Sequence, residues 1–362
     1  MKTKHITLAI LAAASAGAFS AAYADDTSGV TISGFVRASV ESLNSNANYA
    51  WGNVSSTNPN QRVSATGVFG RSQINFNGTE NLGNGLAAVF QVNNRFSTTG
   101  NGYDDQHGAK AGTFASDDTF VGLKSTQWGE IRLGKGTGNT EDGKFDNTVV
   151  VGPDQILGYF GGVTGNNMVR YDLPNFGNFY SSVQYSTDEN KTTSTNASQY
   201  VSLNAGYDAG QWAVSGAYGS KSNQSTATAF TWSTKTGNTS VTDLHLTASY
   251  KPVDVLQLAF EYQRESGNDQ TQNKAALYAY YTMNNIQFGL QGGVESFSGD
   301  KVDGLKNGKF VDAFVHYNLS KQTMAYVEFV NDRDGASGIS TANTTFTSGS
   351  RNLLVVGMSK GF

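Results

Sequence analysis

The sequence predicts an all-β protein, an antiparallel transmembrane β-barrel of sixteen strands. Three observations support this fold class. Apolar and polar residues alternate along most of the chain, short polar turns alternate with long polar loops, and Gly is abundant (42) while Pro is scarce (4) and Cys is missing (0). Period-2 alternation indicates strands with one apolar and one wet face. Short turns at one rim and long loops at the other are typical of a barrel with lipid outside and water inside.

The N-terminal residues are predicted to be a secretory signal peptide. Lys2 and Lys4 give a positive start, residues 6–19 are apolar, and residues 22–24 form a small-x-small cleavage site. We therefore assign residues 1–24 to the signal and residues 25–362 to one barrel domain. A membrane anchor helix is the alternative, but the apolar run is shorter than the ~20 residues that span a bilayer. Because no disulfide is possible, the exported chain needs another constraint, and a closed barrel leaves no sheet edge unpaired.

The first predicted strands set the pattern. In residues 29–42, Val30, Ile32 and Val36 share one parity, whereas Arg37 and Glu41 fall on the other. A second strand is predicted at about residues 64–78, followed by the short Gly/Asn-rich turn at residues 80–85. Both charges of the first strand lie on its wet face. The opposite face is therefore the candidate lipid-facing surface.

The later strands repeat this alternation. It recurs at residues 86–95, 201–207, 212–218, 243–250, 256–263, 286–291 and 311–317, whereas residues 114–124 and 275–283 fit either parity. Further short connections are predicted near residues 172–177, 208–211, 251–254, 283–285 and 318–321, and long ones near 44–62, 221–240, 298–309 and 332–350. Aromatic residues at strand ends beside the short turns indicate an interfacial girdle: Tyr207, Trp212, Tyr250, Tyr317 and Phe362.

A soluble β-sandwich would also show alternation. It would need a second set of inward hydrophobic residues to form a core between its sheets. We find the face opposite the apolar one to be polar in nearly every strand, so the barrel is the preferred interpretation.

Residues 134–162 break the strand pattern. This segment is too long for a tight hairpin and carries acids, lysines and the aromatic pair Tyr159 and Phe160. A structureless insertion of this length inside a compact fold is usually functional or disordered. We take it as the candidate functional element.

The end of the chain and four internal segments carry a family resemblance. The last strand alternates and stops on Phe362, which resembles the terminal signal that outer-membrane barrels present to the barrel-assembly machinery. GVTISGFVRASVE, GRSQINFNGTENLGNGLAAVFQVNNRF, FVGLKSTQWGEIRLGKG and NNMVRYDLPNFGNF resemble successive landmarks of the trimeric general porins of Gram-negative bacteria, of the beta-proteobacterial type. The resemblance covers nearly all of the mature chain.

This resemblance implies an outer-membrane homotrimer of sixteen-stranded barrels. It also implies that the third long loop, residues 134–162 here, folds into the barrel and narrows it. The chain departs from the family pattern at the site: Gln73 replaces the usual Arg, with Arg71 two residues earlier, and Asp117 precedes the FVGL segment. Lys135 replaces the Arg of LGR, and Asp154 replaces a Glu after Pro. Conductance and selectivity therefore do not transfer from relatives.

The parity of the strands predicts a charged lumen. An Arg facing lipid at the midplane would cost about 2–4 kcal/mol, so inward is the favourable orientation. The predicted pore-lining basic residues are Arg37, Arg71, Arg95, Arg132, Arg170 and Lys135. The loop would place carboxylates opposite them, namely Glu141, Asp142, Asp146 and Asp154, and the other lumen acids are Glu41 and Asp117. Fixed charges bias ions by sign, but the basic wall favours anions and the acids oppose it.

The function predicted is passive diffusion of small hydrophilic solutes and ions through an outer-membrane pore. The alternatives are a substrate-specific channel, with Tyr159 and Phe160 lining its path, and an adhesin displayed on a barrel. No enzyme, cofactor or metal is predicted, because His107, His245 and His316 are scattered and no nucleophile elbow is visible. A barrel lipase with a Ser/His pair is the remaining enzymatic alternative. The net charge of −4 gives no support for a nucleic-acid partner.

Overall fold

The computed structural model describes most of the barrel wall. The described residues are 28–46, 62–99, 114–136, 138–142, 165–187, 199–224, 239–267, 269–299, 306–334 and 349–362. The predicted signal peptide, residues 1–24, lies outside them, as do loop residues Asp146 and Asp154 and the side chains of Arg71 and Glu141. No helix within the described ranges is long and apolar enough to cross a membrane.

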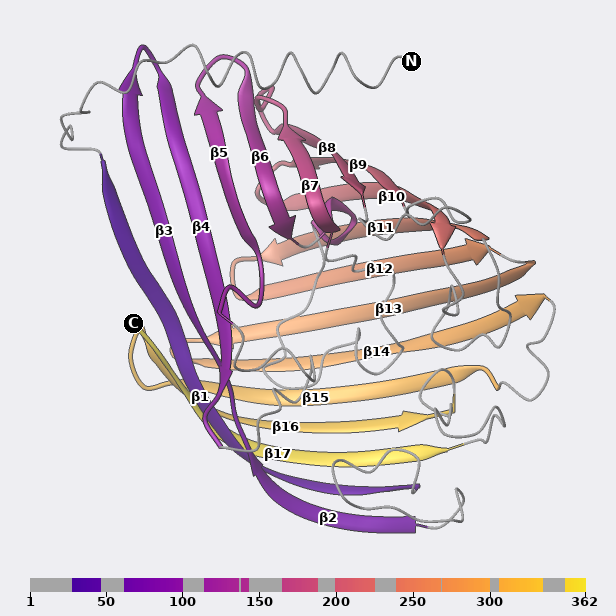
Figure 1. The fold of residues 1–362 in the computed structure, drawn as a ribbon. Helices are drawn as coiled ribbons and strands as arrows, with labels where there is room; N and C mark the ends of the chain where they lie inside the picture. The colour runs from indigo at the N-terminus through magenta and orange to yellow at the C-terminus, as the bar shows by residue number, and fades with distance from the viewer. Residues whose placement is uncertain are drawn as a thin grey trace.

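The wall is built from antiparallel segments that follow the chain order. They are β1 (Gly29–Asn46), β2 (Arg62–Phe69), β3 (Arg71–Gly83), β4 (Leu86–Ser97), β5 (Thr119–Ser125), β6 (Gly129–Gly136), β7 (Gly165–Asp172), β8 (Phe179–Thr187), β9 (Gln199–Asp208), β10 (Trp212–Gln224), β11 (Thr239–Val253), β12 (Leu256–Gly267), β13 (Gln270–Met283), β14 (Ile286–Gly299), β15 (Gly308–Asn318), β16 (Thr323–Arg333) and β17 (Ser350–Gly361). Figure 1 shows β11–β17 lying side by side, with β1 next to β17.

Two of these segments form one strand. β2 and β3 both pair with β1, and the register continues from the Ser39 and Phe69 pair to the Phe35 and Gln73 pair. The ladder is interrupted at Gly70, where the Arg37 backbone N–H donates to Ser72 Oγ at 3.1 Å. β1 also pairs with β17, which closes the sheet. The predicted sixteen-stranded antiparallel barrel is confirmed.

The two faces of the wall follow the predicted parity. Val30 and Ile32 on β1 are 64% and 57% exposed and point outward, whereas Arg37 and Glu41 are buried on the inner face. Large apolar side chains cover the outer face of nearly every strand in this way. At the short-turn rim the predicted girdle residues face outward, and the rings of Tyr207 and Trp212 stack with centroids 5.3 Å apart.

The connections agree with the predicted alternation except at one place. Asn84 and Gly85 have φ of 52° and 74° in the turn between β3 and β4, as a two-residue type I′ turn requires. At the opposite rim the connections are long, but β12 and β13 pair up to Gly267 and Gln270, so only residues 268–269 connect them. The strand pattern did not predict that one connection at the long-loop rim is this short.

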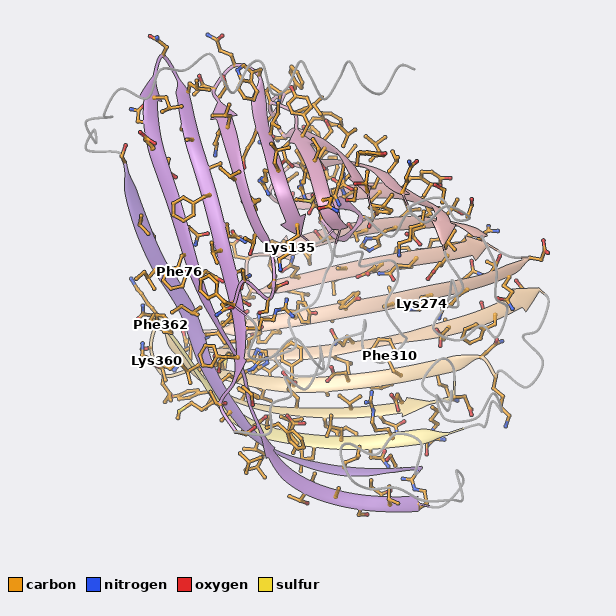
Figure 2. All side chains as sticks on the ribbon, in the orientation of Figure 1. Phe76, Lys135, Lys274, Phe310, Lys360 and Phe362 are labelled. Atoms are coloured by element: carbon orange, nitrogen blue, oxygen red, sulfur yellow. The ribbon has the colours of Figure 1, made fainter. Side chains whose placement is uncertain are left out.

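The inner face is less polar than predicted. Tyr278 and Tyr280 on β13, Phe314 on β15 and Tyr326 on β16 are at most 3% exposed and belong to an inner apolar cluster. The cluster also contains Phe310 (Figure 2) and Leu43, Val330, Leu353 and Val355. The expectation that the inner face is polar in nearly every strand was therefore wrong for these strands. Several of these rings occupy space left by a glycine on the neighbouring strand, as Phe314 does over Gly289 and Tyr326 over Gly357.

The seam that closes the barrel depends on a close approach at Gly34. Its N–H donates to Phe362 O at 3.1 Å, and the Phe362 N–H donates to Gly34 O at 3.0 Å. A Cβ at Gly34 would overlap the carbonyl oxygen of Gln73 and lie 2.9 Å from Phe362 Cζ. Contacts within the barrel therefore require the absence of a side chain at Gly34.

We predict that Gly34→Ala destabilises the closed barrel. The added methyl group must displace β3 or the Phe362 ring, and overpacking of this kind costs about 1–3 kcal/mol. The folded form should convert to the unfolded form at a lower temperature in detergent gels. Gly29→Ala is the matched control, because nothing lies within 4 Å of a Cβ at Gly29 on the same strand. Equal conversion temperatures for the two variants would contradict this explanation.

Candidate functional site

Four of the predicted pore arginines lie on the inner face of the first half of the barrel. Arg37 is on β1, Arg95 on β4, Arg132 on β6 and Arg170 on β7, and all share the inward parity of their strands. The register of β1 with β2 and β3 places the backbone of Arg71 opposite Arg37. These positions form an arc along one side of the lumen, which we call the basic arc.

The sixth predicted basic residue is placed differently. Lys135 stands opposite Thr119 near the end of β6, and it shares the parity of Leu133, which is exposed on the outer face. The register shifts between Gly134 and Gly136, immediately around this position. Lys135 is therefore at the point where the chain leaves the wall (Figure 2).

The basic arc is neutralised where β6 meets β7. Arg132 and Arg170 are directly opposite each other, and Glu130 and Asp172 are opposite each other in the next inward row. Arg132 Nε lies 2.6 Å from Glu130, and its Nη2 lies 3.4 Å from Asp172. Arg170 Nη2 lies 2.7 Å from Asp172 and 2.5 Å from Asp142. Two guanidinium groups are thus surrounded by three carboxylates.

Two further predicted lumen acids have partners nearby. Asp117 forms an ion pair with Arg95, and its backbone N–H donates to Asn93 O at 3.2 Å, which fixes this loop residue against β4. Glu41 accepts a hydrogen bond from Ser39 Oγ at 2.7 Å on the same strand. Both acids therefore already interact with other side chains of the protein.

The beginning of the third long loop lies against the inner wall. Residues 138–142 contain the 3-10 helix η2 (Asn139–Glu141), whose first side chain is fully buried. Asn139 Nδ2 donates to Ser182 O and Oγ on β8 at 3.0 Å each, and its backbone N–H donates to Gln184 Oε1 at 3.2 Å. Ser202 Oγ on β9 donates to Asn139 Oδ1. The loop therefore turns inward after β6, and its course over residues 143–162 lies outside the described residues.

The next loop residue is held by two more strands. Thr140 Oγ1 lies 3.0 Å from Tyr200 OH on β9, and its carbonyl oxygen lies 2.8 Å from His245 Nδ1 on β11. The other ring nitrogen of His245 lies 2.9 Å from Glu261 on β12, and this carboxylate also accepts a hydrogen bond from Tyr278 OH at 2.9 Å. A continuous set of polar contacts thus joins the loop to β12 and β13.

Asp142 is the loop acid whose contacts the structure describes. This acid was expected to stand opposite the arginines. Its carboxylate instead contacts Arg170 directly, because the loop runs along the wall beside β7. Burial raises the pKa of the Asp142 carboxyl group, and the Arg170 guanidinium works against this rise. The ion pair thereby favours the charged form that burial alone would disfavour.

The second half of the barrel carries carboxylates that the list of predicted site residues omits. Strands β11–β16 present them on the inner face, each at most 6% exposed: Asp243, Glu261, Glu265, Glu295, Asp312, Glu328 and Asp332. We call this set the acidic arc. Their signal was present in the sequence, because Asp243, Glu261 and Asp312 fall on the polar parity of segments predicted as strands. The carboxylates that face the basic arc therefore come from the opposite wall as well as from the loop.

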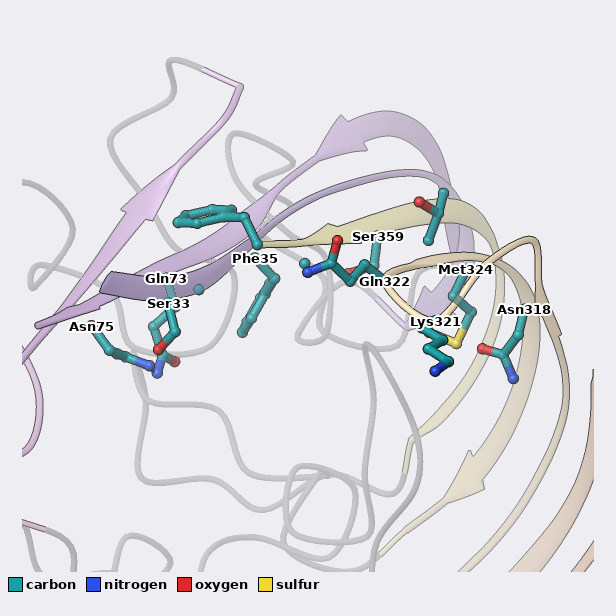
Figure 3. A pocket seen from close by; sticks show the side chains of 13 residues that line it. Ser33, Phe35, Gln73, Asn75, Asn318, Lys321, Gln322, Met324 and Ser359 are labelled. Carbon is teal, nitrogen blue, oxygen red and sulfur yellow. Dashed lines mark hydrogen bonds between the residues drawn. The ribbon is translucent and has the colours of Figure 1, made fainter. Parts of the chain in front are cut away.

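The short-turn mouth of the barrel is lined differently. A cavity there is bordered by Ser33 on β1, by Gln73 and Asn75 on β3, and by Lys321 and Gln322 in the turn between β15 and β16 (Figure 3). Lys321 is the charged side chain of this lining. Neutral amides and hydroxyls make up most of the polar groups at this end of the lumen.

A closed barrel with an apolar outer face, a polar charged inner face and a loop segment fixed inside it defines the class of pore-forming β-barrel proteins. The family model described as "Gram-negative porin" matches residues 7–337, and the chain belongs to this family. Major outer membrane protein P.IB of Neisseria gonorrhoeae is 34% identical over 188 residues, which are 48% of this chain and 47% of that relative. The match therefore spans about half the length of the curated relatives.

Solved structures show the same fold. The anion-selective porin from Comamonas acidovorans matches with a TM-score of 0.70 and 21% identity, over 92% of this chain and 100% of that one. OmpT of Vibrio cholerae, in its trimer form, matches with a TM-score of 0.65 and 14% identity, over 93% of this chain and 100% of that one. At these identities the likeness shows the architecture of the barrel.

We predict that Asn139→Ala loosens the loop from the wall. The change removes the amide that bonds to Ser182 and Ser202, and each buried polar group left without a partner costs ~1–3 kcal/mol. Single-channel recordings should show more frequent transitions between current levels than the unsubstituted protein. Asn331→Ala is the control, since Asn331 donates to Asn352 on another part of the wall, between β16 and β17. A current as steady as that of the control would show that Asn139 does not hold the loop.

Proposed function

We propose that this protein is an outer-membrane general porin. It lets small hydrophilic solutes and ions diffuse passively through a water-filled barrel that a charged loop narrows. The observation that carries the proposal is the course of residues 138–142, which lie inside the barrel and are bonded to β7, β8, β9 and β11. A loop fixed in this position occupies part of the lumen at the level of the basic arc.

The charges on the two walls support selection for polar solutes. Arg37, Arg95, Arg132 and Arg170 stand on one side, and the acidic arc stands on the other. Opposed fixed charges orient water across the lumen, and an apolar solute would have to displace that water without replacing its interactions. Fixed charges also bias the passage of ions by sign. The proposed loop acids Glu141, Asp146 and Asp154 would add to the negative side.

The location and assembly of the protein follow from the same proposal. The apolar outer face would contact outer-membrane lipids, and the barrel would associate as a homotrimer, like OmpT of Vibrio cholerae in its trimer form. Phe362 would act as the terminal signal for the barrel-assembly machinery. Its side chain is 47% exposed on the outer face at the seam, where another protein can contact it.

The alternatives receive less support. A substrate-specific channel needs aromatic rings that a solute can touch. Within the described residues, the rings of the inner apolar cluster, Tyr278, Tyr280, Phe314 and Tyr326, are at most 3% exposed, and Tyr159 and Phe160 lie outside the described residues. Against an enzymatic function, both ring nitrogens of His245 are already bonded, to Thr140 O at 2.8 Å and to Glu261 at 2.9 Å, so neither is left to activate a nucleophile. A display function uses the long loops, and a porin can perform both roles. General diffusion is therefore the function that the described geometry supports best.

Conductance measurements test the channel directly. The purified folded protein should produce stepwise current increases in planar bilayers, and liposomes that contain it should swell in small sugars at rates that fall with sugar size. Heat-unfolded protein provides the control for bilayer damage. Folded protein that gives neither current nor swelling would exclude the pore and favour the display function.

The terminal residue can be tested by assembly. We expect Phe362→Ala to lower the amount of heat-labile trimer that unheated gels of outer membranes show, because the variant loses both the proposed signal and the ring over Gly34. Phe176→Ala is a suitable control, since Phe176 is an exposed aromatic residue in the turn between β7 and β8. Trimer levels that match the control would remove Phe362 from the proposed signal.

A further inference from the structure

We propose that the pore prefers cations to anions and that the inner carboxylates of β11–β17 and β1 determine this preference. The favoured solutes are small inorganic cations and small organic amines. This inference rests on the proposed channel function, and it concerns the sign of charge that the same lumen selects.

The carboxylates form a track along the wall. On the inner face, five successive cross-strand rows each contain at least one of them, beginning at the long-loop rim: Asp243 with Glu265, then Glu295, then Glu261 with Asp332, then Asp312, and then Glu328 with Glu41. Successive inward residues of a strand are ~7 Å apart, which is two steps of ~3.4 Å. A cation that moves along the lumen therefore passes through the field of at least one carboxylate at each row.

Few cations oppose this track. Among the described residues of β11–β17 and β1, these five rows contain one lysine, Lys274, and one arginine, Arg351, against eight carboxylates. Arg351 is already paired with Asp332 at 2.8 Å, and Lys274 stands opposite Glu295. His245 shares the row of Lys274 and bonds to Glu261. The net charge of the track remains negative when all of these are counted as positive.

One carboxylate at the start of the track favours a cation in the lumen. Asp243 is 3% exposed, and neither of its oxygens has a hydrogen-bond partner. It stands directly opposite Glu265, so two acidic side chains meet on the inner face. A buried carboxylate is costly unless it is paired. Lys221 acts on both carboxylates, and Lys274 acts on Glu265 as well. A passing cation would offset this cost, whereas a passing anion would increase it.

The opposite wall does not reverse the balance. Its strongest positive group, Arg132 with Arg170, is surrounded by Glu130, Asp142 and Asp172, so this part of the basic arc carries one more negative than positive charge. Arg95 is balanced by Asp117. Of the arginines of the basic arc, Arg95, Arg132 and Arg170 are therefore compensated within their own wall.

Reversal potentials in a potassium chloride gradient test the inference. We expect the folded protein in planar bilayers to give a reversal potential displaced toward the potassium equilibrium potential. Asp243→Asn combined with Glu265→Gln should shift it toward the chloride value, because the negative charge of this acidic pair at the start of the track is lost. Glu80→Gln is the control, since Glu80 lies on the outward parity of β3 near the short-turn rim and should leave the potential unchanged.

The outcomes separate the two proposals. A channel whose unsubstituted form reverses toward the chloride potential overturns the cation preference but leaves the porin function standing. A cation-selective channel whose double variant reverses at the unsubstituted value removes Asp243 and Glu265 from the track. If the double variant does not fold, Asp243→Asn alone replaces it, because its oxygens hold no hydrogen bond. Folded protein that passes no current overturns the porin function itself.

Discussion

The structure depends on the closure of one hydrogen-bonded sheet. Backbone groups within a membrane must be satisfied internally, so an open edge would leave a row of unpaired donors and acceptors in lipid. The pairing of β1 with β17 removes that edge, and the mutual hydrogen bonds of Gly34 and Phe362 extend it to the last residue. With the sheet closed, every strand has an inside and an outside. The separation of apolar from charged side chains follows from this closure.

The inner face then brings together groups that are distant in sequence. Asn139 and Thr140 follow β6 but bond to side chains on β8, β9 and β11, so the loop crosses several strands of the wall from inside. Asp142 reaches Arg170 in the same way. These contacts position the loop through many neutral hydrogen bonds and one charged group.

Much of the fold could be predicted because strand parity is a local property. Arg37 and Glu41 lie inside and Val30 lies outside, as the alternation indicated. The same rule failed to identify the inner apolar cluster, since Phe314 shares the parity of polar neighbours and its burial depends on Gly289 across the strand pair. It also missed the tight connection at residues 268–269, because a single short turn at the long-loop rim leaves the strand periods unchanged.

The sequence by itself determined the class of fold, the closed wall and the face on which most strand residues lie. Alternation and turn composition are local properties of the sequence, so they can be recognised from a single chain. Only the tertiary structure decided which charges meet. The opposition of Arg132 and Arg170, the contact of Asp142 with Arg170 and the acidic rows of β11–β17 depend on register between strands and on the course of a loop. Register is set by non-local pairing, and for that reason the electrostatic balance of the lumen could not be deduced from the strand pattern.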